Sequence, residues 1–247
     1  MKLVLSSFIF LFYTNTFAFQ FSGNLSGDDF KEIIKSLVSG ASMKSVSNPY
    51  PLGGYTGLQL GMQIENLNTK GLGDLGDATG DNNDINLNVI TVGKGLYNNV
   101  DIFLAMSPFS SSKGTSLYGG SIRWAFFESE DLPISASITA HSVNVNYDST
   151  VIGESSGIRA SIGLSFESSS VYFSAGSLSS KAKFVGGIGA VSSSSSGVTA
   201  SDFEEREELA EFETSFGGVW EFGSYYTGLE LKKTSVSTYT GSIGLRF

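Results

Sequence analysis

The residue best suited to acid–base chemistry is His141, the only histidine of the chain. Imidazole is the commonest general base, and a serine hydroxyl within its reach could act as a nucleophile. Ser142 is the nearest hydroxyl in sequence, but neighbours in an extended strand point to opposite faces, and the residue two positions on is Val143. The spacing therefore favours a histidine hydrogen-bonded among serine and threonine, and we expect no catalytic residues.

Charged residues at alternate positions of several apolar segments form a second group. In extended strands they would share one face with serine and glycine, opposite the apolar side chains. If that face encloses a lumen, the two signs of charge must pair, since an isolated buried charge is costly. The pattern fits either a salt-bridged closed interior or a narrow charged pore. The charges expected to point inward are Arg123, Arg159, Glu167, Glu213, Glu230, Lys232 and Arg246.

Two acidic segments could bind cations. The stretch Gly73–Asp84 offers carboxylate and amide oxygens at alternate positions, but its glycine is misplaced and no glutamate closes it, so the EF-hand spacing fails. The run Glu204–Glu211 is expected to be the solvated face of a loop, with a surface for a cationic partner as the alternative. We therefore expect no metal site and no cofactor.

From Gly53 onward, apolar residues recur with a period of two, as in strands with one apolar face. The pattern predicts an all-β fold, a single antiparallel transmembrane β-barrel over residues 53–247 with about ten strands. A phase shift after Ser142 predicts a β-bulge. An alternative of about twelve strands would add a hairpin within residues 184–212. The expected strands are 55–65, 84–95, 100–107, 117–127, 134–147, 157–167, 171–179, 211–222, 225–234 and 238–247.

The first part of the chain differs from the rest. Residues 1–18 have the features of a secretory signal peptide, namely Lys2, an apolar run too short to span a bilayer and a small-residue cleavage site ending at Ala18. Within residues 19–52, an apolar stripe from Phe30 to Val38 at helical spacing predicts a short helix. We expect this segment either under the barrel on the periplasmic side or inside the lumen as a plug. A disordered or partner-binding arm is the third alternative.

The last strand, Tyr239–Phe247, alternates apolar and polar residues and ends on phenylalanine. Aromatic residues also gather at one predicted end of the strands, as in the belts found at membrane interfaces. In these features the chain resembles bacterial (Gram-negative) outer-membrane β-barrel proteins, with no narrower family indicated. The belt residues are Tyr55, Trp124, Phe126, Phe166, Trp220, Phe222, Tyr225 and Phe247.

The resemblance implies a cell-surface position in the outer membrane, contact with its lipids and recognition of the C-terminal strand by the barrel-assembly machinery. The proteins that the chain resembles also include two families of enzymes whose fold is a barrel and whose catalytic residues include a histidine. Outer-membrane phospholipases place histidine and serine two residues apart on one strand, and omptin-like proteases need paired aspartates beside histidine. His141 has no serine at that spacing, and Asp148 stands without an evident partner. We expect no enzyme.

Composition narrows the function further. The chain has no cysteine, so disulfides and thiolate metal sites are excluded, and its net charge of -9 argues against nucleic acid as a partner. We expect a non-enzymatic barrel with a structural or surface-interaction role through extracellular loops, its ligand unidentified. The alternative is a narrow, porin-like channel or transporter for small or hydrophobic solutes, gated by the N-terminal segment. A soluble lipocalin-like barrel is the structural rival.

Overall fold

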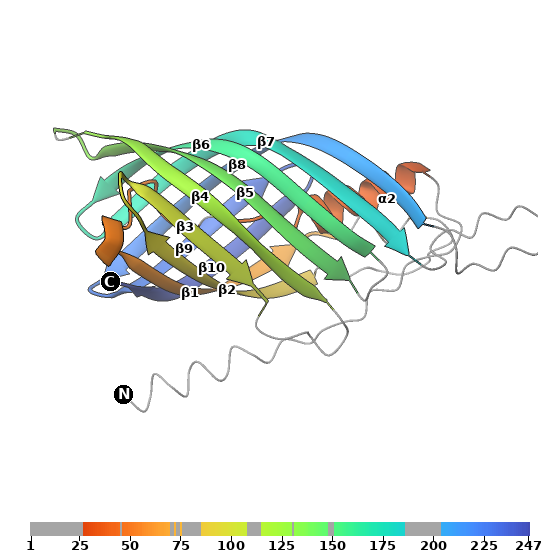
Figure 1. The fold of residues 1–247 in the computed structure, drawn as a ribbon, viewed down its shortest axis with the longest axis horizontal. Helices are drawn as coiled ribbons and strands as arrows, with labels where there is room; N and C mark the ends of the chain where they lie inside the picture. Colours follow the sequence, from red (N-terminus) through yellow and green to blue (C-terminus); the bar gives the residue numbers. More distant parts are fainter. Residues whose placement is uncertain are drawn as a thin grey trace, which may run out of the picture.

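The computed structural model describes residues 27–44, 46–69, 72, 75, 85–107, 115–129, 131–147, 151–185 and 204–247. Within this part of the chain, antiparallel strands pair in sequence order and β1 closes on β10, so that ten strands form a closed barrel (Figure 1). The predicted fold class and strand number are confirmed. The strands are β1 Leu58–Leu67, β2 Ile85–Gly95, β3 Val100–Met106, β4 Ser116–Glu128, β5 Ile134–Tyr147, β6 Val151–Phe166, β7 Ser169–Val185, β8 Glu204–Phe222, β9 Tyr225–Lys233 and β10 Ser237–Arg246.

The barrel has two different ends. The turn end holds the links that follow β2, β4, β6 and β8, together with the C-terminal Phe247, and the loop end holds the links that follow the odd-numbered strands. Strands β5 to β8 have 14, 16, 17 and 19 residues, whereas β1 and β10 have 10 each. About 9–11 residues suffice to cross a bilayer. Strands β5 to β8 therefore exceed this length and extend farther at the loop end. We call this extension, residues 143–147, 151–155, 180–185 and 204–209, the tall wall.

The length of the tall wall corrects several predicted boundaries. Strands β7 and β8 include residues 180–185 and 204–210, which the sequence had assigned to one long connection. Their pairing is continuous and sets Lys181 beside Glu208, so the run Glu204–Glu211 lies on a strand and not in a loop. In the described residues β7 pairs directly with β8, and the additional hairpin of a twelve-stranded barrel is wrong. Serine-rich and charged sequence was misread as loop because polar residues cover the outer face of this wall.

The β-bulge predicted after Ser142 is also wrong. The register between β5 and β6 is unbroken over Ile134–Tyr147, and the irregularity lies on β4, between Ala125 and Phe127. The apolar phase changes for another reason. Before Ser142 the apolar side chains of β5 face outward, whereas Val143 and the apolar residues after it face inward and are buried.

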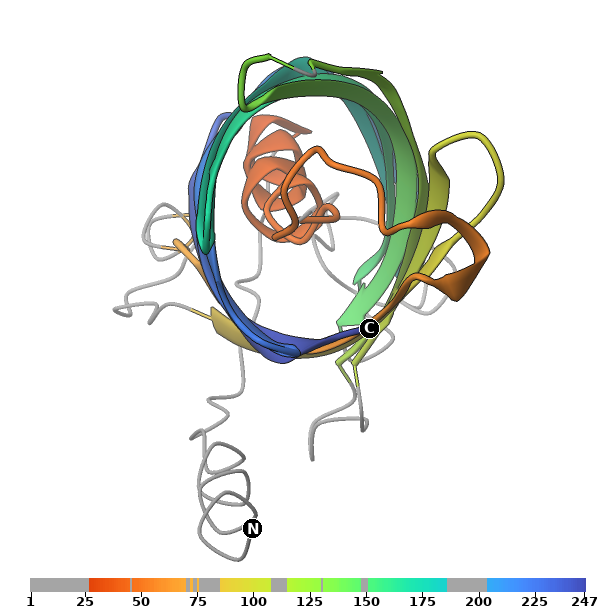
Figure 2. The same cartoon turned by 90° about the vertical axis from the view of Figure 1, so that its left-hand side faces the viewer.

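Residues 27–44 and 46–52 pass through the lumen. Helix α2, Gly27–Ile33, and the π-helix η1, Ile34–Ser39, lie inside the ring of strands (Figure 2). Helix α2 is at the loop end, and the chain leaves the lumen at the turn end through the 3-10 turn η2, Gly54–Thr56 (Figure 1). This turn delays the start of β1 relative to the predicted residue 55. Of the predicted segment 19–52, residues 27–44 and 46–52 lie inside the barrel. Residues 1–18, with the predicted signal peptide, and residues 19–26 lie outside the described part of the chain.

The lumenal segment fits its wall closely. A Cβ at Gly153 of β6 would stand 2.4 Å from Val38 of η1, so only glycine admits the helix there. The rings of Phe30 and Phe184 lie with their centroids 4.5 Å apart at the loop end. No helix among the described residues has the length and apolar character needed to cross a membrane. The buried apolar residues around α2 and η1 include Ile33, Ile34, Leu37, Leu67, Leu87, Leu117, Val143, Val145, Tyr147, Val151 and Ala182.

Candidate functional site

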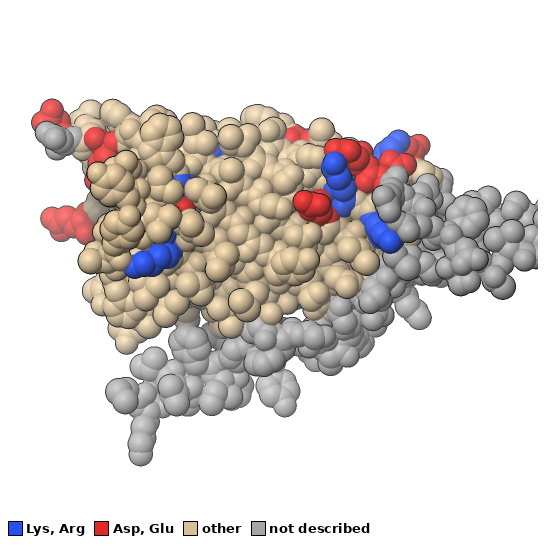
Figure 3. Space-filling model, in the orientation of Figure 1, with Lys and Arg blue, Asp and Glu red and all other residues tan. Residues whose placement is uncertain are grey.

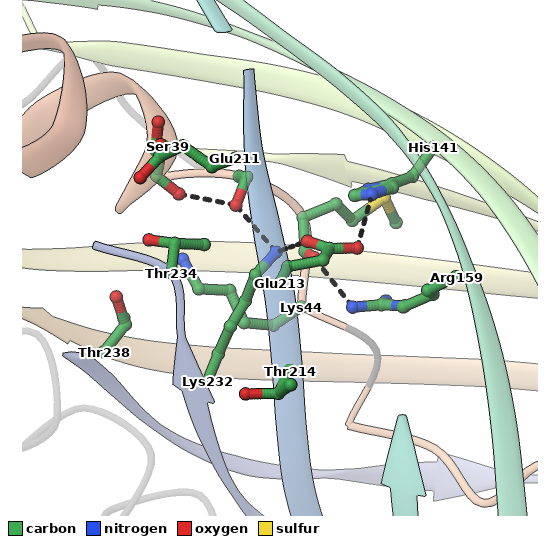
Figure 4. A network of polar contacts seen from close by, with 12 residues as sticks. Ser39, Lys44, His141, Arg159, Glu211, Glu213, Thr214, Lys232, Thr234 and Thr238 are labelled. Atoms are coloured by element: carbon green, nitrogen blue, oxygen red, sulfur yellow. Dashed lines mark hydrogen bonds and ion pairs between the residues drawn. The ribbon is translucent and has the colours of Figure 1, made fainter. Parts of the chain in front are cut away.

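A buried cluster of charges lies inside the barrel around Glu213 of β8 (Figure 4). Its Oε2 atom is 2.5 Å from Nζ of Lys232 on β9, and its Oε1 atom is 3.2 Å from Nε2 of His141 on β5. Arg159 of β6 lies beside the same carboxylate in Figure 4. The carboxylate of Glu213 thus lies beside basic side chains from three other strands. All of these polar groups are buried.

The lumenal segment is tied into this layer by Lys44. Its Nζ atom lies 2.7 Å from Oε2 of Glu65 on β1, and the two side chains are 0% and 3% exposed. Lys44 also donates to the carbonyl of Gly40. From the wall, Nζ of Lys232 donates to Oγ of Ser42 at 2.7 Å. The segment and the barrel therefore share one network of buried ion pairs.

A second group closes the turn end. Arg123 of β4 donates to Oδ2 of Asp101 on β3 from Nε at 3.0 Å and from Nη2 at 2.7 Å. Its Nη1 atom donates to Oγ of Ser47 at 3.0 Å and to the carbonyl of Asn48. Oδ1 of Asp101 accepts the N–H of Leu52 at 3.1 Å. In this ion pair two guanidinium N–H groups share one carboxylate oxygen, and the pair clamps the lumenal segment just before it leaves the barrel.

Most of the charges predicted to face inward do so. Arg123, Arg159, Glu213, Glu230 and Lys232 are buried, and Arg246 is partly buried, with Nη1 at 2.5 Å from Oε1 of Glu221. Glu167 was predicted wrongly. It follows the last residue of β6 and lies exposed in the turn that leads to β7.

Sequence reasoning missed three charges of the network: Lys44, Glu65 and Asp101. Glu65 had a usable signal, since it shares the alternating polar face of its strand with Gln59 and Gln63. Asp101 follows the same rule on β3, where its neighbours Val100 and Ile102 face outward. Lys44 had no such signal because it lies after the helical stripe in a segment without periodicity.

His141 faces Glu213 and not a nucleophile. Ser142 points to the outer face because β5 is unbroken there. Asp148 and all but one residue of the stretch Gly73–Asp84 lie outside the described residues. In the part of the chain that is described, no group of three or more His, Cys, Asp or Glu residues could hold a metal ion. The histidine is thus a buried polar neighbour of the ion-pair network.

The outer surface of the barrel is apolar between the turn end and the tall wall, and we call this stretch the lower part of the barrel. Figure 3 shows a broad band free of lysine, arginine, aspartate and glutamate, with charged residues gathered toward its two ends. The residues of the predicted aromatic belt are all exposed, from 41% for Trp220 to 67% for Tyr55. The outward apolar residues above them include Leu60, Ile90, Leu104, Ile122, Ile138, Ile158, Ile162, Phe173, Phe212, Phe216, Leu229 and Ile243.

The solved structures that are similar to this chain include the following three. The N-terminal β-barrel domain of Pseudomonas aeruginosa OprF is 12% identical with a TM-score of 0.36, over 76% of this chain and 97% of that chain. The attachment invasion locus protein Ail of Yersinia pestis, in complex with the heparin analogue sucrose octasulfate, is 16% identical with a TM-score of 0.34, over 77% and 97%. A second structure of Ail is 13% identical with a TM-score of 0.33, over 77% and 98%. No protein-family model and no curated protein matches the chain.

Proposed function

We propose that this protein is a non-enzymatic outer-membrane β-barrel, closed by its own N-terminal segment, with a structural or surface-interaction role at its loop end. The observation that carries this proposal is the N-terminal segment held inside the barrel. The segment, described over residues 27–44 and 46–52, runs from one end of the barrel to the other. Lys44 forms a buried ion pair with Glu65 of the wall. The wall residues Arg123 and Asp101, paired with each other, hydrogen-bond the segment near its exit.

Placement in a membrane is supported by the outer face. The outward apolar side chains of β8 run from Phe212 to Phe222. With a rise of ~3.3 Å per residue and a tilt of ~40°, this stretch has a height of about 25 Å, the height of the apolar band of outer-membrane barrels. Exposed isoleucine and phenylalanine side chains over such a band would be a large hydrophobic patch in water.

A closed lumen supports a structural or surface role over transport. Ions crossing the barrel would have to displace the segment, and removing one partner of a buried pair costs about 3–5 kcal/mol. What remains for contact with other molecules is the loop end, where the tall wall rises and where Asp28 of α2 is exposed and Asp29 partly exposed.

Single-channel recording in planar bilayers tests the closed lumen. We expect no reproducible unitary conductance from the full chain. A variant lacking residues 27–44 should conduct if it still migrates as a folded, heat-modifiable barrel on gels. Unitary steps from the full chain would refute the closed-lumen proposal.

The orientation can be tested separately because the chain has no cysteine. Asp28→Cys introduces a thiol at the loop end, and Thr56→Cys introduces one at the turn end, both at exposed positions. In intact cells a membrane-impermeant maleimide should label the first variant and spare the second. The reverse pattern would mean that the barrel faces the other way.

A narrow channel gated by the segment is the second candidate. It is favoured by the polar wall that surrounds the segment, which includes Gln59, Gln63, Ser121 and Ser137. A wall of this kind would line a water-filled pore if the segment withdrew. Conductance that starts only under applied voltage, and that a cross-link between the segment and β1 abolishes, would favour this candidate.

A further inference from the structure

The outer face of the tall wall changes character in register across four strands. One row of paired residues, Ala140, Ile158, Ser177 and Phe212, ends the apolar belt. The next row has only small side chains, Ser142, Ser156, Ser179 and Ala210. The row above it is Asn144, Glu154, Lys181 and Glu208. The change in polarity therefore occurs at the same level on all four strands and is not a feature of one strand.

A shallow groove of about 440 Å³ lies on this upper row. It is lined by Asn144, Glu154, Lys181, Lys183 and Glu208, with Ile152, Gly153, Ala182 and Glu207. Val38 of η1 fills the inner side of Gly153, so the groove opens on the outer side of the wall. The row of small side chains beneath it leaves space between the groove and the apolar belt.

The apolar belt determines the height of the groove relative to the membrane. Lysine or arginine on the lipid face costs about 2–4 kcal/mol at the midplane of the bilayer and little near its surface. Lys181 and Glu208 are 59% and 60% exposed on the outer face, which sets them above the hydrocarbon. A lipid whose acyl chains cover Ile158 and Phe212 must then have its headgroup against the groove.

We propose that this groove binds the phosphorylated sugar headgroup of an outer-leaflet glycolipid. The proposal rests on the membrane placement argued under Proposed function. The two ammonium groups of Lys181 and Lys183 suit a phosphate, while Glu154 and Glu208 on either side of Lys181 accept hydrogen bonds from sugar hydroxyls. The carboxylates disfavour a bare anion and the lysines disfavour a bare cation, so the groove selects a ligand that carries both acceptors and donors.

The wall that carries the groove is supported from the inside of the barrel. Lys181 lies 3.4 Å from Glu208, whose Oε1 atom also accepts the hydroxyl of Ser179 at 3.2 Å. Behind the groove, η1 and the inward apolar residues of β5 to β7 form a packed core. Binding therefore needs little ordering of the wall, which favours affinity.

The test uses the full-length barrel in neutral detergent, titrated with diphosphorylated lipid A while thermal unfolding is followed by gel migration. We expect the glycolipid to raise the unfolding temperature of the unaltered protein. The variant Lys181→Gln, Lys183→Gln should need about tenfold more glycolipid for the same shift. The control Lys233→Gln, an exposed outward lysine at the loop end of β9, should behave as the unaltered protein.

Two further probes separate the parts of the ligand. Dephosphorylated lipid A should give a much smaller shift, and inorganic phosphate alone should give none. Equal midpoints for the double variant and the unaltered protein would overturn the proposal, as would a shift from inorganic phosphate alone or an equal loss in Lys233→Gln. Each sample is first shown to migrate as a folded barrel, so a failure of membrane insertion is seen before, and apart from, a failure of glycolipid binding.

Discussion

The tall wall and the part of the barrel below it are built from the same strands with opposite polarity. On β6, Ile158 and Ile162 face outward in the lower part, and the residue Arg159, which lies between them and faces inward, is charged. Higher on the same strand, the outward residue Glu154 is charged and the inward residue Val151 is fully buried among apolar neighbours. The strand runs on without a break while its apolar and polar faces exchange sides.

The difference shows that the polarity of each face of a strand depends on what that face contacts and not on the strand to which it belongs. In the membrane placement that we propose, the outer face below the boundary meets lipid, and the lumen there holds paired charges. Above the boundary the outer face would meet water, and α2 and η1 provide an apolar partner inside. The tall wall with its two helices therefore has its own hydrophobic core, of the kind found in a water-exposed sheet packed on a helix.

The largest expected effect comes from the charged interior of the lower part. Lys44→Leu leaves Glu65 buried without its cation, and we expect a loss of about 4 kcal/mol in the free energy of unfolding. The double variant Lys44→Leu, Glu65→Leu should recover most of this loss because no charge stays unpaired. Urea titrations of the barrel in lipid vesicles measure both. If the single and double variants were equally unstable, the ion pair would not be what holds the segment.

The apolar interior of the tall wall provides the second test. Phe184 on β7 is 2% exposed and packs on Phe30, so Phe184→Ala should cost about 3 kcal/mol. Phe173 is the matched control, since it lies on the same strand but faces outward and is 49% exposed. Its truncation should cost less in the same titrations, because it loses contact with lipid but leaves no cavity in a packed core. Similar losses at the two positions would argue against a separate core in the wall.

The period of two was enough to predict the barrel but not this exchange of faces. Alternation identified the outward residues of the lower part and even the inward direction of His141 and Glu213. It could not reveal where the surroundings change, so the inversion at Ser142 was read as a bulge. A periodic pattern records that two faces differ, without recording which face meets lipid.

The buried ion-pair network was predictable only in part, for a related reason. Inward charges on strands follow from alternation, and most were found. Their partners on the lumenal segment, Lys44, Ser47 and Asn48, lie in irregular chain that has no period. Which carboxylate each cation meets depends on how this segment is threaded, and that is decided by packing between residues far apart in sequence.

A charge on the outer face should distinguish the two parts on a single strand. Ile162→Lys sets an ammonium group in the apolar belt, where we expect a cost of about 2–3 kcal/mol. Ile152→Lys makes the same change on the same face of β6, but in the tall wall, where a surface substitution should stay within about 0.5 kcal/mol. Folding into vesicles, followed by gel migration and urea titration, gives both values. Equal costs would place the membrane boundary above residue 152 and remove the wall from water.

The smallest effect is expected for an exposed lysine–glutamate pair, which can be compared directly with a buried one. Lys181 and Glu208 lie 3.4 Å apart and are mostly exposed, whereas Lys232 and Glu213 lie 2.5 Å apart and are 2% exposed each. Lys181→Gln should change the free energy of unfolding by less than about 0.5 kcal/mol, because water screens the pair. Lys232→Gln should cost several times more, since it leaves a buried carboxylate short of a cation. A large loss from Lys181→Gln would mean that this face of the tall wall is covered in the purified barrel, and unfolding in buffers of rising salt would then leave its stability unchanged.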